Sequence, residues 1–258
     1  MNKILAVLLL MFSCGLLSAE DKSLTLKGMF GATYNQTGVS DNWSGIEKNS
    51  KNWGLKLDAS AEKKYGSDIT WTNVLKEEYG KAEIAGTPEQ VSSDLIDFSS
   101  VLMYNWSVWA NPYVGFLMST VHNTFNDPVT YRESAGIGWA FIDRETQHLK
   151  LRVGAAYRQK FQSGMDAERE TGGEAITNYD ISLSQTAKFT SEARLFTAFK
   201  EGPNLRWDNN LYLKATKYVT VALSYLEIYN AQRIPKPNWA SDIETRFMVT
   251  VGLSYNLF

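Results

Sequence analysis

The clearest pattern in this chain is a strict alternation of apolar and polar residues. Leu151, Val153 and Ala155 fall on one parity, and Lys150 and Arg152 fall on the other. Successive side chains of a β-strand point to opposite faces of the sheet, so this spacing predicts a strand with one apolar face and one charged face. The last segment of the chain repeats the pattern and ends in an aromatic residue.

The same period recurs along the chain and predicts about twelve strands, within a range of roughly 10 to 14. Strands of about 8 to 13 residues are long enough to cross a bilayer at a tilt. We therefore expect an all-β fold, an antiparallel transmembrane β-barrel of about 12 strands. The predicted strands are 23–37, 53–62, 69–79, 95–106, 113–121, 131–142, 149–161, 179–188, 193–200, 205–213, 219–225 and 244–258.

Long polar links and short turns alternate between these strands. The first, third, fifth, seventh and eleventh links are long, and the even-numbered links are short. The ninth link is also short, which breaks the alternation. Bacterial outer-membrane barrels have short periplasmic turns and longer outer loops. The rhythm favours an outer-membrane barrel over the alternative, a soluble periplasmic β-sandwich that binds a ligand.

The composition agrees with a barrel. The mean hydropathy of −0.28 suits strands that average apolar and polar residues, whereas helical membrane proteins need long apolar runs. Aromatic residues near strand ends or on the apolar parity predict girdles at the two membrane interfaces. They are Tyr65, Trp71, Tyr104, Trp106, Trp109, Trp139, Tyr157, Trp207 and Tyr225.

The first residues read as an export signal. Lys3 gives a positive start, an apolar run follows, and Ala19 offers a small-residue cleavage site. We expect residues 1–19 to be a signal peptide and residues 20–258 to be the barrel. The alternative is a lipoprotein that begins at Cys14, the only cysteine. Cleavage after Ala19 removes that cysteine, so disulfides and thiolate chemistry are not expected.

Charged residues on the inward parity are the candidate lumen lining. In one reading both signs pair across a narrow lumen, and in the other the basic strand at 149–161 biases a small water-filled pore toward anions. The net charge of −2 gives no indication that the protein binds nucleic acid. The candidates are Lys56, Asp58, Glu62, Lys150, Arg152, Arg158, Lys160, Arg206, Asp208 and Arg246.

One segment resembles a family of exported outer-membrane proteins filed as domain of unknown function 3078. The resemblance rests on Asn42-Trp43, Gly45, Glu47, Asn49 and Ser50, and on Trp71, Asn73, Leu75 and Tyr79-Gly80 in the strand that follows. It covers about the first third of the mature chain, with Ile46 and Lys48 departing from the family pattern. It implies an outer-membrane barrel and brings no reaction or ligand.

Catalytic residues are few. His122 and His148 are the only histidines, and the predicted strands place them at opposite ends of the barrel. A lipid A or phospholipid hydrolase would need His122 with Ser119 or Thr120 at the outer rim. We expect instead a small passive pore or a structural barrel without enzymatic activity, metal or cofactor. Its expected partners are outer-membrane lipid, lipopolysaccharide and the barrel-assembly machinery of a Gram-negative cell.

Overall fold

A computed structural model describes most of the chain. The described residues are 23–37, 50–84, 86–107, 110–124, 127–199, 202–230 and 243–255. The expected signal peptide with Cys14, the segment from Asn42 to Asn49, Trp109 and Phe258 lie outside these ranges. Within them, no helix is long and apolar enough to cross a bilayer.

The described chain forms twelve strands, and their even number and sequence order agree with the predicted fold. The strands are β1 (Leu24–Thr37), β2 (Ser50–Tyr65), β3 (Ile69–Ile84), β4 (Gln90–Tyr104), β5 (Asn111–Thr120), β6 (Val129–Arg144), β7 (Gln147–Phe161), β8 (Glu168–Ser182), β9 (Ala187–Ala198), β10 (Pro203–Lys214), β11 (Val219–Asn230) and β12 (Ile243–Tyr255).

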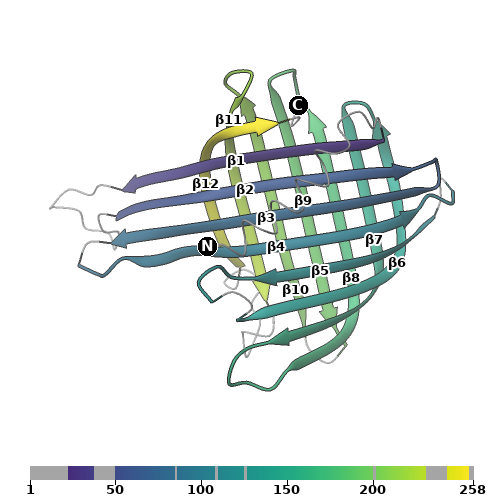
Figure 1. Cartoon of the computed structure of the whole chain (residues 1–258), viewed down its shortest axis with the longest axis horizontal. Coiled ribbons are helices and arrows are strands. Elements are labelled where there is room, and N and C mark those ends of the chain that lie inside the picture. The colour runs from purple at the N-terminus through teal and green to yellow at the C-terminus, as the bar shows by residue number, and fades with distance from the viewer. Residues whose placement is uncertain are drawn as a thin grey trace.

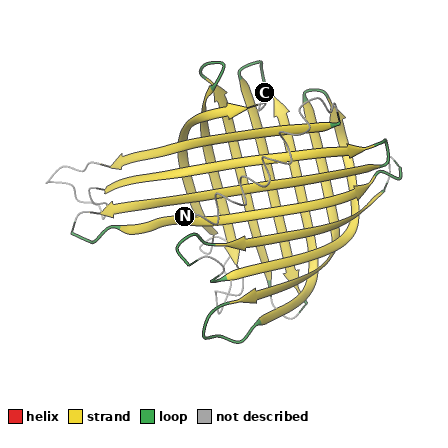
Figure 2. Ribbon diagram, in the orientation of Figure 1, coloured by secondary structure: helices red, strands yellow, loops and turns green. Residues whose placement is uncertain are grey.

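The strands close into one antiparallel barrel. Each strand pairs with its sequence neighbours, and β1 pairs with β12 to complete the circle. In Figure 1, β1 to β5 form the near wall and cross the steeper strands of the far wall, and Figure 2 shows strand throughout. The predicted fold class is therefore confirmed. The β-sandwich alternative is wrong, because a single closed sheet leaves no second sheet to pack against.

The outer face of the barrel is apolar. Phe30, Leu55, Val114, Val153 and Leu253 lie on the outward parity and are between 44% and 61% exposed. Side chains of this kind over a whole sheet face are stable against lipid, and the charged parity faces the lumen instead. The chain is therefore an outer-membrane β-barrel. For the strand at 113–121, whose sequence left its orientation open, Val114 points out and the buried Tyr113 points in.

Two tryptophans on the outer face satisfy serines that would otherwise meet hydrocarbon. The indole Nε1 of Trp71 donates to Ser100 Oγ at 2.9 Å, and that of Trp207 donates to Ser191 Oγ at 2.9 Å. An unpaired hydroxyl in the bilayer core costs several kcal/mol, on the order of 4 or more. Both tryptophans are exposed, together with Tyr65, Tyr104, Trp106 and Tyr225, whereas Trp139 and Tyr157 of the predicted girdles are only partly exposed.

The links follow the predicted order, with three corrections. The third link, predicted as the long polar stretch 80–93, is only 85–89, because 80–84 belong to β3 and 90–93 to β4. The turns at one end are 66–68, 105–110, 145–146, 183–186 and 215–218, and the links at the other are 38–49, 85–89, 121–128, 162–167, 199–202 and 231–242. The seventh link is much shorter than predicted, because residues 168–177 belong to β8. The eighth link lies at 183–186 and not at 190–192, which are part of β9.

The segment taken for a loop is a strand built on close backbone approach. Gly172 and Gly173 are neighbours in β8, opposite Ala198 and Thr197 of β9. A Cβ at Gly172 would lie 2.1 Å from the carbonyl oxygen of Thr197, so only glycine fits there. The sequence predicts this glycine pair at the centre of a long polar link, whereas in the barrel Gly172 lets β8 and β9 pack closely.

A ladder between β1 and β12 closes the barrel. Among the described residues, pairing covers Gly28–Ala32 opposite Val251–Tyr255, whereas β1 and β2 pair from Leu24 to Thr37. Gly31 and Gly252 are partners in this ladder, and a Cβ at Gly252 would lie 2.3 Å from the carbonyl oxygen of Phe30. The first and last strands are therefore joined over a tightly packed seam.

Candidate functional site

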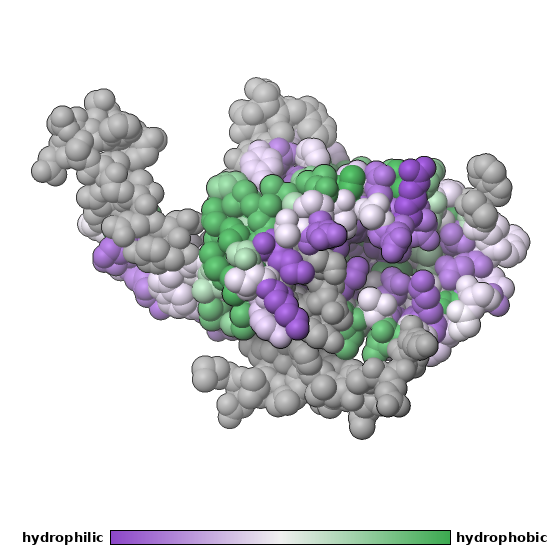
Figure 3. Space-filling model, turned by 90° about the horizontal axis from the view of Figure 1, so that it is seen from above, coloured by the Kyte–Doolittle hydropathy of each residue, from purple (hydrophilic) through white to green (hydrophobic). Residues whose placement is uncertain are grey.

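The candidate site is a cavity of about 920 Å³ inside the barrel. Its lining begins at the short turns, with Gly66, Ser67 and Asn105, and continues inward to Arg194. In the view from above, hydrophilic side chains gather around a recess (Figure 3). Hydrophobic side chains cover the surface immediately to the left of that recess (Figure 3). The arrangement is a polar vestibule, which opens at the turn end, here taken as the periplasmic end.

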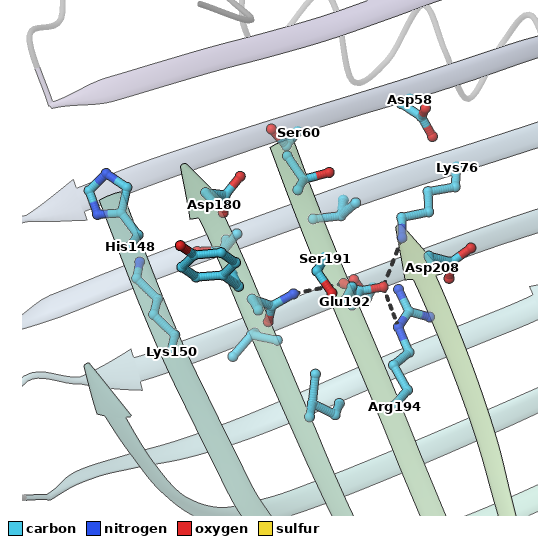
Figure 4. A pocket seen from close by; sticks show the side chains of 18 of the residues that line it. Asp58, Ser60, Lys76, His148, Lys150, Asp180, Ser191, Glu192, Arg194 and Asp208 are labelled. Carbon is cyan, nitrogen blue, oxygen red and sulfur yellow. Dashed lines mark hydrogen bonds and ion pairs between the residues drawn. The ribbon is translucent and has the colours of Figure 1, made fainter. Parts of the chain in front are cut away.

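An ion-pair bridge crosses the lumen at the inner end of the vestibule. Lys76 Nζ lies 2.7 Å from Glu192 Oε1, which also lies 2.7 Å from Arg194 Nε. Arg194 then reaches Asp97 Oδ2 with a 2.6 Å hydrogen bond. The side chains of Lys76, Glu192 and Arg194 meet in Figure 4. Because β3 and β9 lie opposite one another in the closed strand order, these contacts join facing walls.

The bridge is extended by further pairs around the wall. Asn178 donates to Glu192 at 2.9 Å, and Lys56 donates to Asn210 across the lumen at 3.4 Å. Tyr113 donates its hydroxyl to Glu174 at 3.0 Å, and Arg132 lies 3.3 Å from the same carboxylate. Buried carboxylates paired in this way avoid the large cost of an uncompensated charge. The interior at this depth is therefore narrow, charged and internally paired.

Eight of the ten predicted lumen residues line the cavity. They are Lys56, Asp58, Glu62, Lys150, Arg152, Arg206, Asp208 and Arg246. Some of them form pairs of opposite charge, as the first of the two readings expects. Arg206 binds Asp208 through two hydrogen bonds of 2.8 and 3.1 Å, and Arg246 lies 2.7 Å from Glu78.

The other two predicted residues lie elsewhere. Arg158 pairs with Glu170 and stacks 4.8 Å from the ring centroid of Phe196, and Lys160 lies 3.1 Å from Glu168. Neither residue lines the cavity. Both are at the end of β7 that leads into the 162–167 link, beyond the bridge.

Sequence reasoning missed the acids that form the bridge. Glu192 falls in a predicted turn and Glu174 in a predicted loop, so neither was assigned to an inward face. Lys76 and Asp97 lie in strands that were predicted, on the parity opposite the apolar residues. That parity could have found Lys76 and Asp97, whereas Glu174 and Glu192 required the correct positions of β8 and β9.

The two histidines are placed at opposite ends, as predicted. His148 Nδ1 lies 2.8 Å from Asp143 Oδ1 beside the 145–146 turn, and His122 lies in the 121–128 link. The backbone N–H of His122 donates to Asp94, and its ring lies 5.8 Å from that of Tyr79. The Thr120 hydroxyl donates to the carbonyl of Pro128 at 2.8 Å. Across the described ranges, no group of three or more His, Cys, Asp or Glu residues could hold a metal ion.

Several solved barrels are similar to this chain. The translocator domain of the autotransporter NalP from Neisseria meningitidis has a TM-score of 0.44 at 13% identity, covering 99% of this chain and 96% of that one. The NanC porin has a TM-score of 0.46 at 10% identity, covering 90% and 100%. The COG4313 outer-membrane channel from Pseudomonas putida F1 has a TM-score of 0.46 at 9% identity, covering 90% and 93%. No curated protein matches the chain.

The family expected from the sequence is wrong. The resemblance to domain of unknown function 3078 rested on residues 42–50 and on a short piece of β3, and alternating strand residues recur in unrelated barrels. The family that matches is described as "Protein of unknown function, DUF481", and it covers residues 46–256, most of the barrel. The chain belongs to this family.

Proposed function

We propose that this protein is a narrow pore for small polar solutes in the bacterial outer membrane. The observation that carries the proposal is the charge-lined vestibule, which runs from the turn end to the bridge between Lys76 and Glu192. A lumen lined by charges of both signs holds water, whereas a structural barrel needs only a filled interior. The bridge acts as the constriction.

The constriction is held by contacts that solute or salt can compete with. Lys76 and Glu192 remain partly exposed inside the lumen, with side-chain exposures of 24% and 18%. The Arg194–Asp97 pair of the same bridge is buried, with side-chain exposures of 9% and 6%, so the contact that opens most readily is the more exposed one between Lys76 and Glu192. Passage past the bridge therefore needs side-chain motion only.

Planar-bilayer conductance of the refolded protein tests this proposal. The wild-type protein should give small discrete steps, and Glu192→Gln should enlarge them several-fold because it releases Lys76 from the facing wall, while Arg194 stays paired with Asp97. The matched control is Glu168→Gln, which breaks the Lys160 pair near the outer links and leaves the bridge intact. Equal conductance for both variants would contradict the bridge as the constriction, and no conductance for any of the three proteins would overturn the pore.

A structural barrel is the second candidate, and the bridge itself favours it. Contacts between facing walls close the lumen at the depth of Glu192. If wild-type protein and Glu192→Gln are both silent in bilayers while refolding normally, the structural role replaces the pore.

We also propose that the barrel has no catalytic activity. The rival hydrolase requires His122, whose Nε2 is buried and has no hydrogen-bond partner among the described residues. Replacement of His122 by alanine should leave the lipid A and phospholipid profiles of the cell unchanged, as measured by mass spectrometry. A changed profile would support the hydrolase. The apolar exterior supports contact with membrane lipid and, during insertion, with the barrel-assembly machinery.

A further inference from the structure

Strand β7 carries a row of basic residues along the vestibule. His148, Lys150 and Arg152 share the inward parity and all line the cavity, from the turn end toward the bridge. Alternate residues of a strand lie about 7 Å apart, so the three side chains follow one another at even steps. Figure 4 shows His148 and Lys150 side by side on this strand.

Two of these cations form no direct ion pair with a described residue. Within the part of the chain that the structure describes, neither Lys150 nor Arg152 forms an ion pair or a hydrogen bond, whereas His148 is held by Asp143. The guanidinium of Arg152 lies over the ring of Tyr113, whose centroid is 5.3 Å from the guanidinium carbon. That contact leaves the N–H donors of the guanidinium unused.

The charges around Arg152 are already matched to one another. Lys76 and Arg194 are taken up by Glu192 and Asp97, and Arg132 by Glu174. Arg152 is the fourth cation beside these three carboxylates. The inner end of the vestibule therefore carries one positive charge in excess, located on Arg152.

The surroundings of Arg152 hold its side chain in place. Tyr113 is fixed by its hydrogen bond to Glu174, so the ring under the guanidinium cannot swing away. Gly138 is the strand partner of Arg152, and a Cβ at that position would lie 3.4 Å from Arg152 Cγ. The glycine leaves space for the stem. A pre-positioned guanidinium binds an oxyanion with little further loss of side-chain entropy.

We infer that Lys150 and Arg152 form a binding site for the carboxylate or phosphate group of a small solute that enters the vestibule from the turn end. The planar guanidinium binds two oxygens of such a group at once, and Lys150 supplies a second cation one step nearer the entrance. The inference deepens the proposed pore, on which its consequence for transport rests. In transport terms, the site makes the pore selective for anions.

Calorimetric titration of the detergent-solubilised full barrel tests the site without requiring conductance. Sodium succinate, sodium phosphate and sodium chloride are compared at constant ionic strength, so that carboxylate and phosphate binding are told apart. Wild-type protein should bind succinate, phosphate or both more tightly than chloride. Arg152→Gln should weaken that binding about tenfold or more, as loss of a charge-assisted hydrogen-bond pair predicts.

Three further variants keep the test decisive. Arg152→Lys keeps the charge but loses the two-oxygen geometry, and should recover only part of the affinity. Lys150→Gln should weaken binding several-fold and remains informative if Arg152→Gln fails to fold. Lys217→Gln removes the same charge from the 215–218 turn, outside the cavity, and should leave affinity unchanged.

Two results would overturn the inference: wild-type protein that binds neither succinate nor phosphate above chloride, or affinity that is equal in wild type, Arg152→Gln and Lys150→Gln. Reversal potentials in a salt gradient separate this failure from failure of the pore. A conducting barrel with no anion preference contradicts the site alone. A silent barrel that still binds succinate or phosphate contradicts the pore alone.

Discussion

At the scale of single residues, two neighbouring glycines in β8 have opposite roles. A Cβ at Gly172 would meet the backbone of β9 at 2.1 Å, whereas one at Gly173 would meet a methyl group of Thr197 at 3.8 Å. The first distance cannot be accommodated without moving a strand, and the second is ordinary contact. Of this pair, only Gly172 therefore has to be glycine.

We predict that Gly172→Ala destabilises the barrel by about 1 to 3 kcal/mol, the usual cost of overpacking, with strain in the β8–β9 ladder as the cause. Gly173→Ala is the matched control and should change stability by less than about 1 kcal/mol. Urea unfolding of both variants in lipid vesicles, followed by tryptophan fluorescence, measures the difference. Equal stabilities would show that the strands separate more easily than the geometry implies.

Residue patterns also decide how far the sequence predicts the site. Lys150 and Arg152 lie in a strand whose apolar partners alternate without error, so their inward orientation follows from the sequence. The orientation of Glu174 does not, because its strand contains Gly172, Gly173 and two threonines in place of large apolar residues, and Glu192 lies in the strand paired with it. Periodicity cannot be detected where the outward side chains are small.

At the scale of elements, two of the links contact one another. Asp127 in the 121–128 link accepts a 2.9 Å hydrogen bond from the backbone N–H of Ser163 in the 162–167 link. The hydroxyl of Ser163, and then its backbone N–H, hold the pKa of the Asp127 carboxyl below its ordinary value. The contact ties together two links that project from the same end of the barrel.

This link contact should depend on pH in a defined direction. A carboxyl whose pKa is lowered by folding stabilises the contact above its unfolded pKa, about 3.9, and loses that stabilisation as the pH falls through the lowered value. We predict that the Ser163 amide is protected from hydrogen exchange at neutral pH and loses protection in acid, as the pH falls below the unfolded pKa of Asp127 and through its lowered folded pKa.

Asp127→Asn removes the titrating group and is the control for that measurement. Its Ser163 amide should show no change in protection between neutral and acid pH beyond the intrinsic pH dependence of exchange. If wild type and Asp127→Asn respond alike, another group controls the contact between the two links.

Elements differ in how well the sequence predicts them. The sequence predicts the ends of β6 and β7 to within two residues. It predicts β8 at 179–188, whereas the strand runs from Glu168 to Ser182. The total of twelve is still correct, because each predicted strand overlaps mainly with one observed strand. Residues 168–178 of the predicted seventh link belong to β8, residues 183–186 of the predicted eighth strand form a turn, and the predicted turn at 190–192 lies inside β9. Even strand number is thus more robust than strand position.

At the scale of the whole molecule, closure of the barrel depends on the seam between β1 and β12. Phe30 and Leu253 are partners in this seam and lie 223 residues apart in sequence (253 − 30). Ile137 and Val153 are partners in the long β6–β7 ladder and lie 16 apart (153 − 137). The entropy of closing a chain loop grows with the logarithm of its length.

We predict that a disulfide between Phe30→Cys and Leu253→Cys, in a Cys14→Ser background, stabilises the barrel by about 2 kcal/mol more than one between Ile137→Cys and Val153→Cys. The longer loop removes more freedom from the unfolded chain. Heat-dependent migration in detergent gels, with and without reductant, reports the difference. If the disulfide between β6 and β7 stabilises the barrel more than the disulfide between β1 and β12, loop length does not control the gain.

The bridge between Lys76 and Glu192 has a mechanical consequence. A closed sheet can become rounder or flatter in cross-section without losing its ladder hydrogen bonds, and a contact between opposite strands braces it against that change. Because Lys76 and Glu192 are only 2.7 Å apart and partly buried, dissolved salt screens this brace much less than it screens charges on an open surface. The cross-section of the barrel is therefore coupled to one ion pair, and a variant that lacks it should resist flattening less than the wild-type barrel does.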